Sequence, residues 1–296
     1  MQLGLYLPSF AKINWTLRIV GRRGDGFHEL FTVFQTVSLH DTLNFSASEI
    51  LELTCDDPSI PTDEGNLIIR AANSLRAAAR TDRGARIHLK KRIASPGGLG
   101  GGSSNAAAAL IGLRRLWDVQ IDDGELCQIA SSLGSDVPFF LHGGTAIGTG
   151  RGETIEPIAD IDEQQMLIVT PNIDISTRDA FAGTNAATLT NEHMDHILSV
   201  CRQDAGSFDP RHSVLINDFE RTVFSAYPEI ERVKTTLTEL GATIAAMSGS
   251  GASVFAVFDK KEARQAAQEA LGHEPTWRKF AVSTISRGKY REALGI

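Results

Sequence analysis

The sequence predicts an α+β protein of two domains, and three observations support this. Strand-like segments cluster ahead of the first domain's long helices instead of alternating with them. A glycine-rich stretch, Gly97–Asn105, separates a strand-like run from an alanine-rich helical run. Beyond residue 158 the expected order is strand, helix, two strands, helix and strand, as in a ferredoxin-like fold. We therefore expect domains at residues 1–158 and 159–296.

In the first domain, short apolar or alternating runs predict strands at Leu3–Leu7, Ile13–Val20, Phe31–Ser38, Thr42–Ser46, Leu51–Cys55 and Ala85–Leu89. Apolar residues at helical spacing predict helices at Asn66–Ala79, Ala106–Leu116 and Asp123–Leu133. Ser103, Ser104 and Asn105 are the candidate N-caps of the second of these helices. Gly134 follows the third, where glycine is favoured after a helix C-terminus.

In the second domain, the same patterns predict strands at Met166–Thr170, Thr243–Met247, Ser253–Phe258 and Phe280–Ser286. Helices are expected at Glu229–Leu240 and Lys260–Leu271, after a polar and partly helical insertion. The turn Ser248–Ala252 is a second glycine-rich segment. It either closes over phosphates or is a plain hairpin turn, and the sequence favours neither.

Composition narrows the class of protein. The chain has 296 residues, of which 42% are hydrophobic and 22% charged, enough to build packed cores. A net charge of −7 argues against a nucleic acid partner. No apolar run approaches the roughly 18 residues that span a bilayer, so no membrane partner is expected. The three cysteines, Cys55, Cys127 and Cys201, lack metal-ligand spacing, and we expect a cytoplasmic protein without a metal site of its own.

The glycine-rich stretch has the character of a phosphate-binding loop. Glycines let a phosphate approach the main chain, and the helix that follows presents unpaired N–H groups and a positive dipole end. The spacing is not that of a P-loop, because Ser103 stands where lysine should follow Gly102. It is not a dinucleotide fingerprint either. The alternative is a flexible linker, which is seldom followed at once by a capped helix.

Several motifs together resemble one family, and they are Ala11–Asn14, Gly21–Leu30, Gly98–Ala107, Gly134–Phe140, Asn217–Glu220 and Ser248–Ala252. The resemblance is to the 4-diphosphocytidyl-2-C-methyl-D-erythritol kinases of the GHMP kinase superfamily. It implies an S5-like N-terminal domain and a ferredoxin-like C-terminal domain. It also implies ATP-dependent phosphorylation of the 2-hydroxyl of a substrate with a cytidine diphosphate moiety, in the non-mevalonate route to isoprenoids. Mg²⁺ is expected to be carried with ATP.

The resemblance assigns ATP binding to one continuous segment, consisting of Ala94, Ser95, Pro96, Gly97, Gly98, Leu99, Gly100, Gly101, Gly102, Ser103, Ser104 and Asn105. The family usually has proline where this chain has Ala94, and here Pro96 follows two residues later. A proline fixes its own φ and lacks an N–H, so one phosphate donor could be lost. Ser104 is the candidate contact for Mg²⁺.

Lys12 and Asp136 are the candidate catalytic residues. An unpaired ammonium is costly to bury, so Lys12, between Ala11 and Ile13, needs an acidic partner or a phosphate, unless it is an edge-strand lysine facing solvent. The resemblance places Lys12 beside Asp136 and makes Asp136 the base that accepts the hydroxyl proton. The alternative for Asp136 is an ordinary helix N-cap.

The resemblance places the substrate at a second group of residues, namely Asn14, Asp25, Phe27, His28, Thr177 and Phe181. Phe27 replaces the tyrosine common in the family and keeps a face for stacking on cytosine. His28 offers ring and backbone groups to the base edge, although a lone histidine is more often structural. Asn14 is expected at the methylerythritol, and Phe181 is expected to be a second aromatic against the base.

Two other functions remain open. The chain could be another small-molecule GHMP kinase, although cytidine suits the Phe27–His28 segment better than homoserine or mevalonate does. It could also be a nucleotide-binding regulator without catalysis, but both Lys12 and Asp136 are present. The sequence is compatible with a monomer or a homodimer.

Overall fold

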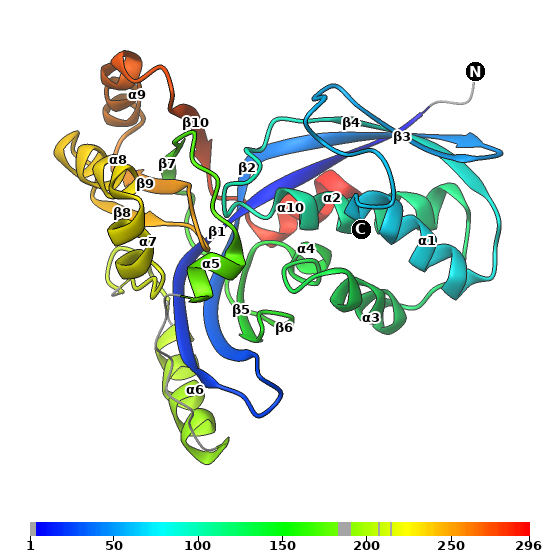
Figure 1. Cartoon of the computed structure of the whole chain (residues 1–296), viewed down its shortest axis with the longest axis horizontal. Helices are drawn as coiled ribbons and strands as arrows, with labels where there is room; N and C mark the ends of the chain where they lie inside the picture. Colours follow the sequence, from blue (N-terminus) through cyan, green and yellow to red (C-terminus); the bar gives the residue numbers. More distant parts are fainter. Residues whose placement is uncertain (1–3, 183–190, 207, 214) are drawn as a thin grey trace.

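Two sheets organise the chain, as Figure 1 shows for the computed structural model, which describes residues 4–182, 191–206, 208–213 and 215–296. The first sheet has six strands in the order β3–β4–β2–β5–β6, with β1 paired to β2. These strands are β1 (Leu5–Arg22), β2 (His28–Ser48), β3 (Leu51–Cys55), β4 (Gly84–Lys90), β5 (Thr145–Gly150) and β6 (Thr154–Pro157).

β1 and β2 are much longer than the sequence suggested. Each merges two expected strands into one, and register shifts interrupt their pairing at Phe10/Ala11, Asn14/Thr16 and Ile19/Gly21. A bulge breaks the period-two alternation, so one continuous strand looks like two separate runs in the sequence. Leu3, the expected start of the first run, lies outside the described residues. β5 and β6 were not predicted.

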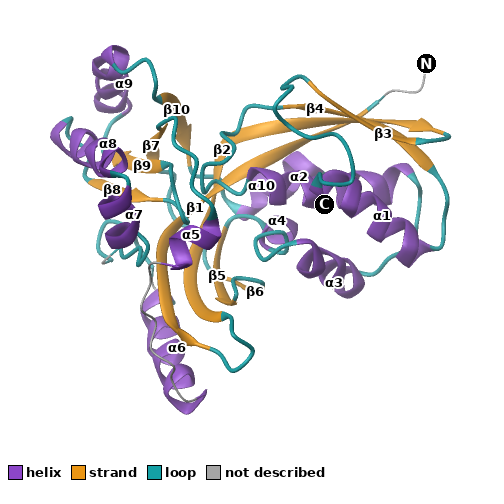
Figure 2. Cartoon of the chain, viewed as in Figure 1, coloured by secondary structure: helices purple, strands orange, loops and turns teal. Residues whose placement is uncertain are grey.

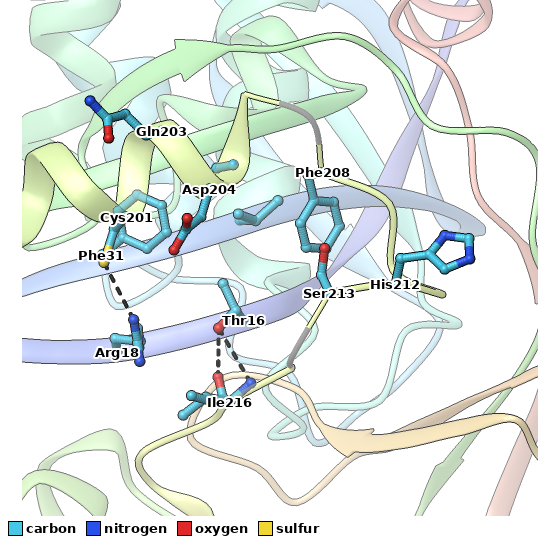
Figure 3. A pocket seen from close by; sticks show the side chains of 12 residues that line it. Thr16, Arg18, Phe31, Cys201, Gln203, Asp204, Phe208, His212, Ser213 and Ile216 are labelled. Carbon is cyan, nitrogen blue, oxygen red and sulfur yellow. Dashed lines mark hydrogen bonds between the residues drawn. The ribbon is translucent and has the colours of Figure 1, made fainter.

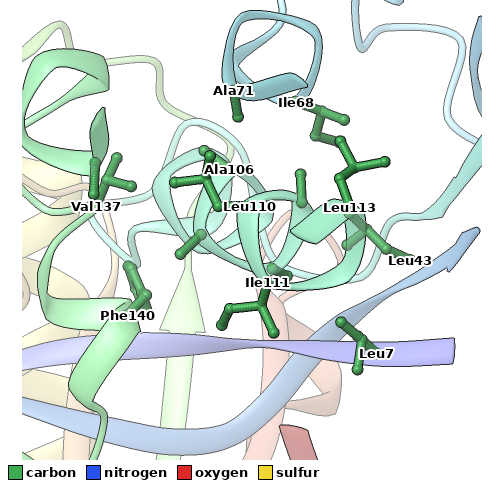
Figure 4. Close-up of a cluster of buried hydrophobic side chains, with 14 of the residues drawn as sticks. Leu7, Leu43, Ile68, Ala71, Ala106, Leu110, Ile111, Leu113, Val137 and Phe140 are labelled. Atoms are coloured by element: carbon green, nitrogen blue, oxygen red, sulfur yellow. The ribbon is translucent and has the colours of Figure 1, made fainter. Parts of the chain in front are cut away.

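Helices α1 (Leu67–Ala79), α2 (Gly101–Leu116), α3 (Asp123–Leu133) and α4 (Phe139–His142) cover one face of the first sheet (Figure 2). α2 is the centre of this layer and has apolar neighbours on several sides (Figure 4). Leu110 and Leu113 of α2 are fully buried, in one cluster with Ile68 of α1 and Leu43 of β2. This packing fixes the direction of α2 and therefore the position of its N-terminus.

The second sheet has four strands in the order β10–β7–β9–β8, and every pair is antiparallel. Its strands are β7 (Gln165–Thr170), β8 (Ile244–Met247), β9 (Val254–Phe258) and β10 (Arg278–Ser283). The connecting helices are α8 (Pro228–Glu239) and α9 (Lys261–Ala270), the latter followed by a 3-10 turn, Leu271–His273. The order β7–α8–β8–β9–α9–β10 confirms the predicted ferredoxin-like arrangement.

The insertion after β7 carries helices α5 (Thr177–Ala182), α6 (Asn191–Ala205) and α7 (Glu220–Ala226). α6 lies beside the far end of the β1–β2 ribbon, below the second sheet in Figure 1. Throughout the described residues, every helix is too short or too polar to serve as a membrane span.

Helix α10 (Arg287–Leu294) follows the second sheet but packs against the first domain's core. Tyr290 and Leu294 are each 2% exposed, and the Tyr290 hydroxyl donates a hydrogen bond of 2.5 Å to the carbonyl of Phe140. Burial of the ring raises the pKa of Tyr290. The predicted division at residue 158 therefore separates the two sheets. It places α10 in the second domain, although this helix packs on the first.

Candidate functional site

The glycine-rich segment ends in the first turn of α2. The helix begins at Gly101, and Gly100 occupies the N-cap position with φ of +69°, a backbone region that glycine adopts readily. The prediction of Ser103, Ser104 and Asn105 as N-caps was wrong, since all three lie inside the helix. Because glycine has no capping side chain, the first N–H groups of α2 keep their donors for an external acceptor.

The residues of this segment have different surroundings. Ala94, Leu99, Ser104 and Asn105 are at most 4% exposed. Gly102 is exposed, and a Cβ added there would meet only Leu67 Cδ1, at 3.7 Å. The segment thus has a buried support and an open side at Gly102.

The second glycine-rich turn packs directly on the first. Ser248 Oγ donates to the carbonyl of Gly98 at 2.9 Å, and Ser253 N donates to the carbonyl of Gly97 at 3.2 Å. A Cβ at Gly98 would lie 2.1 Å from Ser248 O, so only glycine permits this contact. The turn between β8 and β9 is therefore more than a hairpin connection, because it supports the predicted phosphate loop.

Asn217 holds this turn in place. Its Nδ2 donates to the carbonyls of Met247 and Gly249, each at 2.8 Å, and its Oδ1 accepts from Phe219 N at 3.0 Å. The Asn217–Glu220 motif contributes to the family resemblance, but the sequence alone assigns it no role. The amide and the turn it supports are about thirty residues apart in the sequence, so no local pattern could reveal their contact.

Lys12 and Asp136 lie together as predicted from the resemblance. Lys12 is 3% exposed, and its Nζ lies 3.4 Å from Asp136 Oδ2 and donates to Asn14 Oδ1 at 2.6 Å. Its backbone N donates to Leu99 O at 3.0 Å, which ties β1 to the glycine loop. The solvent-facing alternative for Lys12 is thereby excluded. Asp136 is not the cap of α4 either, because that position belongs to Pro138.

A β-bulge decides which side chains of β1 enter this site. Lys12 and Asn14 share one side of the strand, and Asn14 Nδ2 donates to Thr32 Oγ1 of β2 at 2.7 Å. After the bulge between Asn14 and Thr16, Thr16 and Arg18 line a different cavity. Bulges commonly redirect side chains in this way, and a strict period of two would have kept Thr16 beside Asn14.

The site is a cavity of about 690 Å³ to which both domains contribute. The predicted residues that line it are Lys12, Asn14, Phe27, His28, Pro96, Gly98, Gly100, Ser103, Asp136, Thr177 and Phe181. Lining residues that the sequence analysis missed include Thr32, Phe34, Ser135, Arg151, Arg178 and Phe219. Thr32 and Phe34 could have been found from their period of two on β2, directly across from β1.

One end of the cavity is aromatic. Phe27 is 52% exposed, with the Arg151 guanidinium carbon 5.1 Å from its ring centroid. The rings of His28 and Phe181 stack at 4.9 Å with an interplanar angle of 11°, and Phe181 meets Phe219 edge-on. Burial, and to a lesser degree the charge of Arg22, lowers the pKa of His28 below its usual 6.5. Thr177 Oγ1 lies 3.2 Å from Ser250 Oγ of the second glycine turn.

Asp25, expected at the substrate, does not line this cavity. Its Oδ1 accepts from Phe27 N at 3.1 Å, and its Oδ2 lies 3.1 Å from Arg23 Nη2. The hydrogen bond from Phe27 and the contacts with Arg23 lower the pKa of Asp25. Its carboxylate therefore shapes the turn that presents Phe27.

A second cavity of similar size lies on the other side of β1, against the end of α6 (Figure 3). Arg18 donates to Cys201 Sγ at 3.5 Å there, and Thr16 Oγ1 donates to the carbonyl of Ile216 at 2.9 Å. None of the predicted site residues lines this second cavity.

Known proteins share this arrangement of elements and motifs. Residues 66–144 match the GHMP kinases N terminal domain, and residues 199–275 match the GHMP kinases C terminal domain. The 4-diphosphocytidyl-2-C-methyl-D-erythritol kinase of Solibacter usitatus is 38% identical to this chain, over 97% of it and 90% of its own length. The chain belongs to this family of GHMP kinases.

Other members of the family agree. The enzyme of the same name from Thermoanaerobacter pseudethanolicus is 35% identical over 95% of this chain and 96% of its own length. A crystal structure of 4-(cytidine 5'-diphospho)-2C-methyl-D-erythritol kinase superposes with a TM-score of 0.76 at 32% identity, covering 95% of this chain and 99% of that one. As a member, the chain is an ATP-dependent small-molecule kinase, and the predicted fold class is confirmed.

Proposed function

We propose that this kinase phosphorylates the 2-hydroxyl of 4-diphosphocytidyl-2-C-methyl-D-erythritol, giving the 2-phosphate and ADP. The supporting observation is that one cavity holds both the Lys12–Asp136 pair and the aromatic group of Phe27, His28 and Phe181. A kinase for a small alcohol needs the first group only. A nucleotide-linked alcohol gives the second group a purpose, because its base can stack on an aromatic ring.

ATP fits the glycine-rich side of the cavity. The N-terminus of α2 offers uncapped N–H groups and a positive dipole end to the phosphates. Gly102 leaves its side of the helix open, whereas Gly98 and Gly100 are already packed on Ser248 and on Phe140 with Lys12. We expect the phosphates to approach over Ser103, which lines the cavity, and over the neighbouring Gly102, which is exposed outside its lining.

For phosphoryl transfer, the protein has to position the two substrates, stabilise the negative charge of the transferred group and accept a proton from the hydroxyl. In our proposal the Asp136 carboxylate accepts the proton of the 2-hydroxyl as that oxygen bonds to the γ-phosphorus, while the bond from this phosphorus to the β,γ-bridging oxygen breaks and ADP leaves. Lys12, held by Asn14 Oδ1, compensates the negative charge of the transferred group. Asn14 in turn is oriented by Thr32, so the ammonium has a fixed place before substrate binds.

At the cytidine end, the base has no room between His28 and Phe181. The separation of 4.9 Å between the His28 and Phe181 rings leaves no space for a third ring between them. We therefore propose that cytosine stacks on the exposed face of Phe27, and that His28, neutral at pH 7, offers a ring nitrogen to the base edge.

Mg²⁺ is expected to arrive with ATP and to neutralise charge on its phosphates. Within the described part of the chain, no group of three or more His, Cys, Asp or Glu side chains could hold a metal ion. Ser104, the expected contact, fits poorly, because it is 1% exposed and its Oγ lies 2.8 Å from Ser9 Oγ. Ser103 lines the cavity and fits better.

We expect this kinase to act in the cytoplasm.

The direct test is ADP release by the pure protein with ATP and Mg²⁺. The alcohols to compare are 4-diphosphocytidyl-2-C-methyl-D-erythritol, mevalonate, homoserine and galactose, with the site of phosphorylation located by phosphorus NMR. We expect turnover of the first alone. Preferred turnover of any other would support the alternative of a different GHMP kinase, and ATP binding without any turnover would support a regulator.

A further inference from the structure

The turn between β5 and β6 crosses the cavity from its aromatic end to its catalytic end. Arg151 on this turn lines the cavity beside Phe27. Gly152, the next residue, also lines it, and a Cβ there would lie 3.9 Å from Cβ of Ser135, the neighbour of Asp136. The turn therefore borders both the aromatic end and the Asp136 end of the cavity proposed for the substrate.

The turn is held firmly in this position. Gly150 N donates to Glu29 Oε1 at 2.7 Å, and both Gly150 and Gly152 have positive φ, at +73° and +104°. Arg151 N donates to Glu153 Oε2, and Arg151 Nε lies 3.3 Å from Glu153 Oε1. The Arg151 side chain is 39% exposed, so its guanidinium is oriented but still accessible to a ligand.

Two cationic side chains of the cavity, Arg151 and Arg178, have no catalytic task in the proposed function. Among the described lining residues, the lysine, arginine and acidic side chains are Lys12, Arg151, Arg178 and Asp136. Lys12 is already engaged by Asp136 and Asn14. A diphosphate bears a negative charge on each phosphate, which the pair of Lys12 and Asp136 does not balance. Arg151 is the arginine whose guanidinium carbon lies 5.1 Å from the Phe27 ring centroid, and its Nε is paired with Glu153 on the same turn.

We propose that Arg151 binds the diphosphate of the cytidine substrate and thereby determines the preference for a nucleotide-linked alcohol. This inference rests on the proposed function. A guanidinium suits the role because its planar set of donors can bind phosphate oxygens in pairs, which an ammonium cannot do. The contact with Phe27 adds a second role, since it keeps the guanidinium next to the ring on which the base stacks.

Calorimetric titration of the complete protein with cytidine and with cytidine 5'-diphosphate separates the base from the diphosphate. We expect wild type to bind the diphosphate more tightly than cytidine. Arg151→Met should weaken binding of the diphosphate by about 10- to 100-fold, the usual loss for a charge-assisted contact, and leave cytidine unchanged. Arg151→Lys should restore part of the loss. Arg86→Met, on β4 with a side chain 63% exposed, is the matched control.

Steady-state kinetics gives a second measurement on the same variants. Arg151→Met should raise KM for 4-diphosphocytidyl-2-C-methyl-D-erythritol with little change in KM for ATP. Unchanged cytidine binding also shows that the variant is folded. Equal affinity of wild type and Arg151→Met for the diphosphate would overturn the inference and leave the proposed function intact. If wild type bound neither cytidine ligand and did not turn over the substrate, the proposed function would fail with it.

Discussion

Lys12 Nζ and Asp136 Oδ2 lie 3.4 Å apart, and the two residues differ in exposure. The Lys12 side chain is 4% exposed, whereas that of Asp136 is 32% exposed and borders the cavity. The buried member of the pair is therefore fixed by its surroundings, and the exposed member faces the cavity. This asymmetry suits an immobile cation beside an accessible proton acceptor.

Asp136→Asn tests the acceptor. The change is nearly isosteric, so folding and binding of both substrates should persist while the proton acceptor is lost. General base catalysis contributes about 10²–10⁴-fold, and we expect kcat to fall by at least about 10² with KM little changed. Asp123→Asn on α3, whose side chain is 92% exposed, is the control. Near-normal kcat with a lower Tm would mean that Asp136 is structural.

Lys12→Met tests whether the pair acts as a unit. The methionine keeps the length of the buried chain and removes the charge, and Asp136 remains accessible to water. We expect kcat to fall by about 10²-fold or more. The double variant with Asp136→Asn should cost less than the two single effects combined, because groups that act together are non-additive. Additive losses would show that the two side chains act independently.

Phe27→Ala tests the aromatic end. Loss of one ring that stacks on a base should weaken substrate binding by about 1–3 kcal/mol and leave ATP affinity nearly unchanged. Tyr6→Ala removes an aromatic side chain that is 65% exposed and outside the cavity, and should have no effect on either ligand. Titration calorimetry provides both affinities. Equal losses for the two ligands would mean that Phe27 supports the fold and does not contact the base.

Gly102→Ala tests the phosphate site. The new Cβ meets only Leu67 Cδ1 at 3.7 Å, an ordinary contact, so Tm should not fall. Phosphate oxygens approaching the N-terminus of α2 would meet the methyl group, and we expect a higher KM for ATP. Gly272→Ala, where nothing lies within 4 Å, is the matched control. An unchanged KM for ATP would place the phosphates away from Gly102.

The titration of His28 should appear in the pH dependence of substrate binding. Its pKa is lowered from 6.5, so the neutral ring predominates at pH 7 and protonation occurs in more acidic solution. KM for the cytidine substrate should rise as the pH falls below 6.5, because the protonated ring has no acceptor nitrogen. His28→Phe keeps a ring against Phe181 and should remove this dependence. If the pH profile of His28→Phe were identical to that of wild type, His28 would not be the group whose titration affects substrate binding.

The same shift has a consequence for stability. The unfolded chain takes up the proton of His28 at a higher pH than the folded chain does. This contribution to the free energy of unfolding is therefore complete above pH 6.5, and it is lost as the pH falls through the lowered pKa. Thermal unfolding of wild type and His28→Phe across this range would measure it.

The second domain was the easier one to predict. Its strands are short and regular, so the pattern of apolar residues follows the elements β7, β8 and β9 closely. In the first domain the prediction was wrong at β1 and β2, where bulges interrupt the alternation of apolar residues. It was also wrong at the start of α2, because the first turn of this helix consists of glycine and serine and has low helical propensity. Packing of Leu110 and Leu113 in the core stabilises the helix regardless of that turn.

The site shows a similar division. Lys12, Asp136, Phe27 and His28 lie in recognisable motifs and do line one cavity, while their chemical roles stay predictions. Arg151 and Phe219 reach the cavity only because distant segments pack together. Arg151 has no local signal, since an arginine in a turn is an ordinary surface residue. Phe219 lies in the Asn217–Glu220 motif, but nothing in that motif shows that its ring reaches the cavity.

Helix α10 bears on the order in which the protein matures. Residues 287–294 are translated after all of the second sheet, yet Tyr290 fills the space beside Gly143, where any Cβ would meet its ring at 2.1 Å. During translation, the apolar site that Tyr290 and Leu294 fill in the first domain therefore stays exposed until α10 has been synthesised. The core of the first domain thus receives its last helix only after the strands of the second domain have been synthesised.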